Sequence, residues 1–146
     1  MATINQYGTY VIQKIIIHIP EDNRKDFNLI FVKFICLFSR DRLGIYAVKK
    51  FIKHTKDKIV VSQFLNIILE NFVNIAQNKF GNYLIQYLLE IWWTKKTGDY
   101  IKKEIESKYN LLSQNRYSSY ICELYLKLKS QIVNNNGLNN EILELK

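Results

Sequence analysis

The chain has 146 residues, which is room for one domain or for a short array of repeats. Hydrophobic residues make up 48% of it, enough to build a packed core, so wholesale disorder is excluded as a reading. The formal net charge of +8 favours an anionic partner such as nucleic acid or an anionic membrane surface, although a solvated, lysine-rich exterior gives the same sum.

Membrane-spanning and secreted proteins are disfavoured. The apolar run 15–19 is interrupted by His18 and followed by Pro20, and no stretch reaches the ~18 apolar residues that a spanning helix needs. Cys36 and Cys122 lie among apolar residues without paired or metal-ligand spacing. We therefore expect a soluble, intracellular protein with buried free thiols, no metal and no cofactor.

Four segments of the chain share one pattern. They are Asn5–Gln13, Asp41–Lys49, Asn78–Gln86 and Asn115–Glu123, and their starts are 36, 37 and 37 residues apart. Each segment runs Asn or Asp, a polar or basic residue, an apolar or aromatic residue, Gly or Ser, a variable residue, Tyr, two apolar residues and a polar residue. Four matches at one period indicate four tandem copies of one structural unit.

Each copy is expected to begin a helix. The first residue of each pattern is a good N-cap, because its side chain can accept from the first free backbone N–H groups: Asn5, Asp41, Asn78 and Asn115. Two apolar pairs follow at helical spacing, as Leu84/Ile85 and Leu88/Leu89 do in copy three, so each helix should bury one face. A small residue should allow close packing at each helix start: Gly8, Gly44, Gly81 or Ser118.

The stretches between the copies also favour helix. Residues 27–38, 60–76 and 100–112 carry apolar residues at three- and four-residue spacings, and no strand-like alternation persists. The sequence therefore predicts an all-α solenoid over residues 1–130, in which each unit contacts its neighbours. We expect the first unit to lack its leading helix, and residues 131–146 to form a polar, Asn-rich tail that is disordered or weakly helical.

One face of the repeated helix carries groups suited to nucleic-acid bases. Asn82 and Gln86 are four residues apart and share a helix face, with Tyr83 beside them. Amide groups can hydrogen-bond a base edge, and a tyrosine ring can stack on a base. A single such tyrosine is more simply a core residue, but the recurrence at one offset favours the binding reading: Tyr10, Tyr46, Tyr83 and Tyr120.

The copies resemble Pumilio-type (PUF) repeats, whose helices carry a Gly-Asn-Tyr-Val-Ile-Gln type of core. Residues 81–86 (Gly-Asn-Tyr-Leu-Ile-Gln) and 8–13 (Gly-Thr-Tyr-Val-Ile-Gln) match it closely, residues 111–123 resemble the penultimate repeat of the family, and the likeness covers about residues 2–127. The resemblance implies a curved superhelix of three-helix repeats of about 36 residues. It also implies single-stranded RNA read one base per repeat, antiparallel to the protein, by arrays of about eight repeats.

The base code of the family can be carried over to copies three and four. Asn82 with Gln86 implies uracil. Ser119 with Glu123 implies guanine, because the carboxylate accepts from the guanine edge.

Copies one and two depart from the family pattern. Thr9 with Gln13 resembles the small-residue-plus-Gln combination that implies adenine, although Thr is an unusual choice there. Ile45 cannot hydrogen-bond a base, so copy two is expected to stack through Tyr46 and to contact phosphate through Lys49. The implied target is 5′-G-U-N-A-3′, which fits within the UGU-containing element of the family if a further repeat reads the leading U.

The resemblance implies binding to mRNA 3′ untranslated regions in the cytoplasm, with translational repression or mRNA decay as the outcome and repressor or deadenylase proteins as possible partners. Two alternatives remain open. A divergent, nucleolar ribosome-biogenesis protein would bind structured RNA with little base preference, and a protein-binding scaffold would have no RNA affinity.

Catalysis is not expected. His18 and His54 lie in different copies and share no spacing to Cys or acidic residues, and no phosphate-binding glycine loop or nucleophile motif occurs. We therefore expect two surface histidines and neither a small-molecule substrate nor a membrane partner.

Overall fold

The protein is a stack of helices. The computed structural model describes residues 5–144, with side chains through residue 137, and contains no strand in that range. The helices are α1 (Gln6–His18), α2 (Glu21–Val32), α3 (Ile35–Ser39), α4 (Gly44–His54), α5 (Lys58–Glu70), α6 (Phe72–Ala76), α7 (Gly81–Ile91), α8 (Lys96–Ser107), α9 (Tyr109–Ser113) and α10 (Ser119–Glu144).

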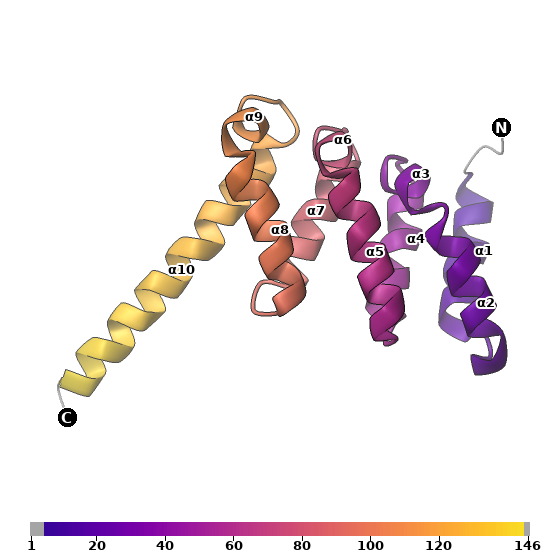
Figure 1. Ribbon diagram of the computed structural model, residues 1–146, viewed down its shortest axis with the longest axis horizontal. Helices are drawn as coiled ribbons and strands as arrows, with labels where there is room; N and C mark the ends of the chain where they lie inside the picture. The colour runs from indigo at the N-terminus through magenta and orange to yellow at the C-terminus, as the bar shows by residue number, and fades with distance from the viewer. Residues whose placement is uncertain (1–4, 145–146) are drawn as a thin grey trace.

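The helices form two long layers joined along one edge by short helices. α1 packs on α4, α4 on α7 and α7 on α10, while α2 packs on α5 and α5 on α8. Figure 1 shows α2, α5 and α8 nearest the viewer, α4 and α7 behind them, and α3, α6 and α9 along the upper edge. The prediction of an all-α repeat solenoid is confirmed, and each complete unit is a long, a short and a long helix.

The stretches between the copies are each divided into two helices, a break that apolar spacing did not reveal. α2 and α3 are separated at Lys33 and Phe34, while single residues, Asn71 and Lys108, separate the corresponding helices of later units. At Asn71 the backbone leaves helical geometry (φ −113°, ψ 19°), and the side-chain Nδ2 donates to the carbonyl oxygen of Ile67 at 2.9 Å. Neither glycine nor proline marks these breaks.

The predicted caps of the repeated helices are confirmed. Asn5 Oδ1 accepts from the Gly8 N–H at 2.7 Å. In the later copies the cap side chain accepts from two backbone N–H groups at 2.8–3.1 Å: Asp41 from Leu43 and Gly44, Asn78 from Phe80 and Gly81, and Asn115 from Tyr117 and Ser118. These bonds satisfy donors that the first helical turn cannot pair internally.

The small residue at each helix start packs against the preceding short helix. A Cβ on Gly44 would lie 2.6 Å from the carbonyl oxygen of Phe38, and one on Gly81 would overlap the carbonyl oxygen of Ile75. Ser118 is fully buried, and its Oγ donates to the carbonyl oxygen of Leu112 at 2.6 Å. Gly8 differs, because a Cβ there would meet only its own cap side chain, at 3.4 Å.

The apolar pairs form the core in the middle of the stack and not at its ends. The members from copies two and three are all at most 6% exposed: Ala47, Val48, Phe51, Ile52, Leu84, Ile85, Leu88 and Leu89. By contrast, Val11 and Ile15 are 53% and 40% exposed, and Leu126 is 50% exposed. The expectation that every copy buries both pairs was therefore wrong for copies one and four, whose helices have a neighbour on only one side among the described residues.

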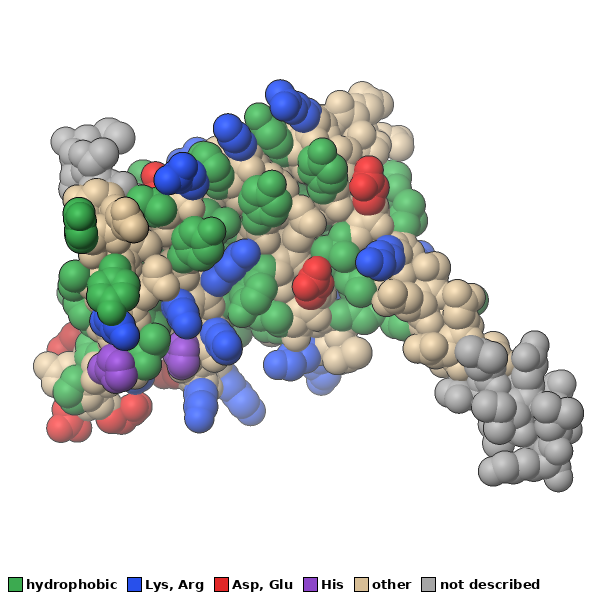
Figure 2. All heavy atoms as spheres, turned by 180° about the vertical axis from the view of Figure 1, so that it is seen from behind, with side chains coloured by type: hydrophobic (Ala, Val, Ile, Leu, Met, Phe, Trp, Pro, Cys, Tyr) green, Lys and Arg blue, Asp and Glu red, His purple; other side chains and the backbone are tan. Residues whose placement is uncertain are grey.

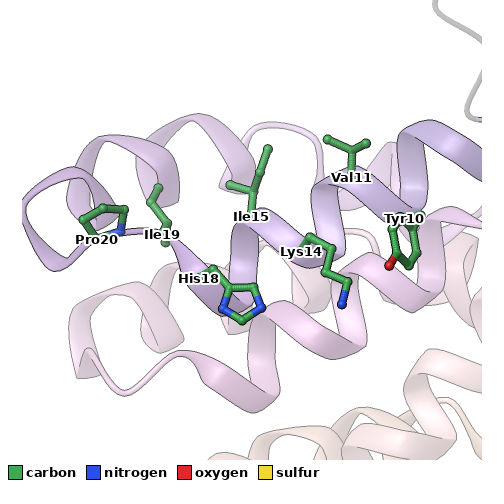
Figure 3. Close-up of a pocket in the computed structure, with 7 residues that line it drawn as sticks. All are labelled: Tyr10, Val11, Lys14, Ile15, His18, Ile19 and Pro20. Atoms are coloured by element: carbon green, nitrogen blue, oxygen red, sulfur yellow. The ribbon is translucent and has the colours of Figure 1, made fainter.

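The exposed side of α1 is a shallow, largely apolar hollow. Figure 3 shows Val11, Ile15 and Ile19 along it, with Lys14 and His18 as its polar members. The corresponding positions of α4 and α7 are covered by the preceding helix of the stack.

The Asn-rich segment that follows copy four is helical. α10 runs without a break from Ser119 to Glu144, and Figure 1 shows it projecting from the stack. Side chains 129–137 are exposed. Residues 145–146 of the predicted tail lie outside the described part of the chain.

Cys36 and Cys122 are both free, the first half-buried and the second buried. Among the described helices, none combines the length and the apolar character needed to cross a bilayer.

Candidate nucleic-acid interface

Four tyrosines occupy one position on four neighbouring helices. Tyr10 on α1, Tyr46 on α4, Tyr83 on α7 and Tyr120 on α10 are 61%, 55%, 54% and 53% exposed. A core role would bury them, so their exposure leaves the rings available for contacts with a ligand. The surface of α1, α4, α7 and α10 that carries them is called here the tyrosine face. Figure 2 shows the molecule from this side, with hydrophobic and Lys or Arg side chains interspersed and few acidic ones.

The predicted base-edge residues lie at two depths beside the tyrosines. The residue before the tyrosine is 4%, 5% and 1% exposed in copies one to three and half-buried in copy four: Thr9, Ile45, Asn82 and Ser119. The residue three after the tyrosine reaches further out and is half-exposed or exposed: Gln13, Lys49, Gln86 and Glu123. The structure thus brings each trio together, with its first member below the surface.

Copy three contains a chain of hydrogen bonds. The Nδ2 of Asn82 donates to the carbonyl oxygens of Asn78 and Lys79, at 3.0 and 2.9 Å. The Oδ1 of Asn82 accepts from Nε2 of Gln86 at 3.0 Å. A direct contact of Asn82 with a base, as the family code implies, stays a prediction, and it would require these bonds to be exchanged.

Copies one and four treat the same position differently. Ser119 Oγ donates to the carbonyl oxygen of Arg116 at 3.2 Å, so it uses the same kind of backbone acceptor as Asn82 does. Thr9 Oγ1 is buried and has no hydrogen-bond partner among the described residues. No described hydrogen bond joins Thr9 to Gln13.

Copy two presents a cation where the others present an amide or a carboxylate. Lys49 Nζ lies 5.3 Å from the centre of the Tyr87 ring in copy three, a cation–π contact across the boundary between units. Burial lowers the pKa of Lys49, and the carboxylate of Glu90 opposes that shift. Ile45 lies beneath the surface, as its lack of polar atoms requires.

A second set of cations was not singled out from the sequence. The second residue of the pattern is basic and exposed in three copies: Arg42, Lys79 and Arg116. Lys79 and Arg116 each lie over the aromatic ring of the next residue, at 5.6 and 5.5 Å from its centre. The signal was present in the sequence as a basic residue recurring at the repeat period.

The two histidines lie at or near the surface, as expected: His18 is exposed and His54 half-exposed. Burial and several nearby cations, Lys50 first, lower the pKa of His54. Within the described residues no three His, Cys, Asp or Glu side chains cluster in a way that could hold a metal ion.

Comparison with known proteins points to one family. Residues 3–26 and 71–91, which include the repeated patterns of copies one and three, match the family described as "Pumilio-family RNA binding repeat". Over 100 residues, or 68% of its length, the chain is 24% identical to an Arabidopsis thaliana protein named as a pumilio homolog, number 17. The chain spans 30% of the length of that relative.

Proposed function

Since the chain carries Pumilio-family RNA binding repeats, we propose that its tyrosine face binds single-stranded RNA with sequence specificity, one base per copy. The observation that carries the proposal is the row of four exposed tyrosines, each beside a polar side chain that reaches the surface. Stacking of a base on an aromatic ring contributes roughly 1–3 kcal/mol, and polar neighbours at a fixed distance from the ring can distinguish one base edge from another.

The family code gives an expected base for three copies. Copy four, through Ser119 and Glu123, is proposed to read guanine, and copy three, through Gln86 with Asn82 behind it, uracil. Copy one, through Thr9 and Gln13, is proposed to read adenine. Because RNA of this family runs antiparallel to the protein, the proposed target is 5′-G-U-N-A-3′ within a UGU-containing element.

Copy two is proposed to hold its nucleotide without reading it. The buried Ile45 offers no hydrogen bond, so Tyr46 would stack on the base while the Lys49 ammonium contacts a phosphate. The half-exposed position of Lys49 and its distance from any salt bridge among the described residues support that role.

The biological role is proposed from the family alone. A UGU-containing element in an mRNA 3′ untranslated region would be the ligand in the cytoplasm, and translational repression or mRNA decay would follow through repressor or deadenylase proteins.

One alternative has an observation of its own. A copy without base readout, together with the exposed cations Arg42, Lys79 and Arg116, also suits a ribosome-biogenesis protein that binds structured RNA mainly through its phosphates. Such a protein would show a steep salt dependence and little base preference.

A binding assay separates the two. A labelled RNA that contains UGU is titrated at physiological salt against the same RNA with ACA in its place. Sequence-specific readout predicts a loss of roughly tenfold or more for the ACA ligand, since a wrong base costs about 1–3 kcal/mol. Equal affinity for the two RNAs would favour the alternative.

A further inference from the structure

The Gln86 side chain on the tyrosine face is held from below. Asn82 is 1% exposed, and all of its side-chain contacts are internal: two donated bonds to the carbonyl oxygens of Asn78 and Lys79, and one accepted from Gln86. The buried amide therefore connects the backbone at the helix start to a side chain at the surface.

These bonds determine which way both amides point. A carbonyl oxygen can only accept, so the NH₂ end of Asn82 must face Asn78 and Lys79, and its Oδ1 must face Gln86. Only the NH₂ end of Gln86 can donate to that oxygen, which it does at 3.0 Å. The orientation of the Gln86 amide is thus set by backbone carbonyls through Asn82, and its Oε1 end is the one that this bond leaves free.

A fixed amide orientation matters for telling uracil from cytosine. Uracil presents the O4 acceptor beside an N3–H donor, whereas cytosine presents an N4–H₂ donor beside the N3 acceptor. For a base held in one place by stacking on Tyr83, donor and acceptor exchange positions between the two pyrimidines. An amide free to turn over would bind both, because it offers an acceptor at one end and a donor at the other.

We propose, on the basis of the proposed function, that Asn82 determines the base preference of copy three without touching the base. It does so by fixing which end of the Gln86 amide meets the RNA. Asn82 is then a positioning residue, and Gln86 is the side chain that contacts the base edge.

Copy one provides a natural contrast. Gln13 occupies the position of Gln86, but the residue below it is Thr9, whose buried Oγ1 has no partner in the described structure. Nothing comparable fixes the Gln13 amide, so Gln13 should accommodate either orientation. Copy one can therefore be used to install the device as well as to lack it.

The test compares the full chain with its Asn82→Ser variant on two RNAs that differ only by U or C at the nucleotide of copy three. The wild type is expected to favour U about tenfold. The variant should bind the U ligand within about fivefold of wild type while its preference over C falls to twofold or less. An unchanged ratio in the variant would overturn the proposal.

A double-mutant cycle excludes direct contact. In a Gln86→Ala background, Asn82→Ser should have no further effect on RNA affinity, because Asn82 acts through Gln86. A further loss there would show that Asn82 touches the base and would also overturn the proposal. If the wild type bound neither RNA, the proposed function would fail together with this inference, whereas U-preferring wild type with an unchanged variant ratio would defeat this inference alone.

The reverse substitution does not depend on how well copy three tolerates change. Thr9→Asn should give Gln13 a fixed orientation and raise the preference for U over C at the nucleotide of copy one by about fivefold. No change in that ratio, in a variant that unfolds at the temperature of the wild type, would contradict the role assigned to the buried amide.

Discussion

Copies one and three carry the same pattern in different surroundings. Gly81 is packed on the carbonyl oxygen of Ile75, while Gly8 meets nothing beyond its own cap residue. Likewise, the buried residue of the trio is fully hydrogen-bonded in copy three and unpartnered in copy one among the described residues. The difference teaches that a repeat motif specifies a helix and its face, while the neighbouring helices decide how tightly each position is held.

The largest expected effect is on stability. Gly81→Ala places a methyl group against the Ile75 carbonyl and should lower the free energy of unfolding by on the order of 3 kcal/mol. Gly8→Ala is the matched control, and it should be neutral or stabilising by up to about 1 kcal/mol, because alanine is the better helix former and space is available. Urea unfolding of both variants measures the difference, and equal losses would contradict the packing described for copy three.

The sequence predicted the caps and the buried face because both are local. A side-chain oxygen at Asn78 reaches its N–H groups within three residues, and helical spacing alone puts Leu84 and Leu88 on one side. The helix breaks at Asn71 and Lys108 were not predictable in this way, since no glycine or proline marks them and the packing of the short helices against α7 and α10 stabilises them.

A second comparison sets the two layers of the stack against each other in RNA binding. Tyr83 on the tyrosine face and Tyr100 on α8, in the other layer, are each 54% exposed. Tyr83→Ala should weaken binding of a UGU-containing RNA by roughly 1–3 kcal/mol through loss of stacking, and Tyr100→Ala should leave it unchanged. Similar losses in a titration of both variants would mean that the RNA does not lie on the tyrosine face.

The candidate site was predicted in outline, and its depth was not. Helical spacing correctly put Asn82, Tyr83 and Gln86 near one another. It could not show that the first of them lies at 1% exposure beneath the third, because burial depends on how closely α4 and α10 approach α7. The recurring basic residues at the pattern's second position were visible in the sequence and became candidates only once they proved exposed.

The smallest expected effect concerns copy two. If Lys49 contacts a phosphate, Lys49→Ala should reduce the slope of log affinity against log salt by about 0.7, the value for one contact to a single strand. Lys103→Ala, which removes an exposed lysine of α8, should leave the slope unchanged. Identical slopes for the wild type and the Lys49 variant would remove Lys49 from the interface.

Base-by-base readout is tested most directly by exchanging the code of copy four. The double variant Ser119→Asn with Glu123→Gln is titrated, beside the wild type, with two RNAs that carry UGU or UUU and are otherwise identical. The wild type should favour G at the middle position, because the carboxylate of Glu123 accepts from the guanine edge, and the variant should favour U. A variant that still prefers G, or that binds both RNAs equally, would contradict the reading of one base per copy.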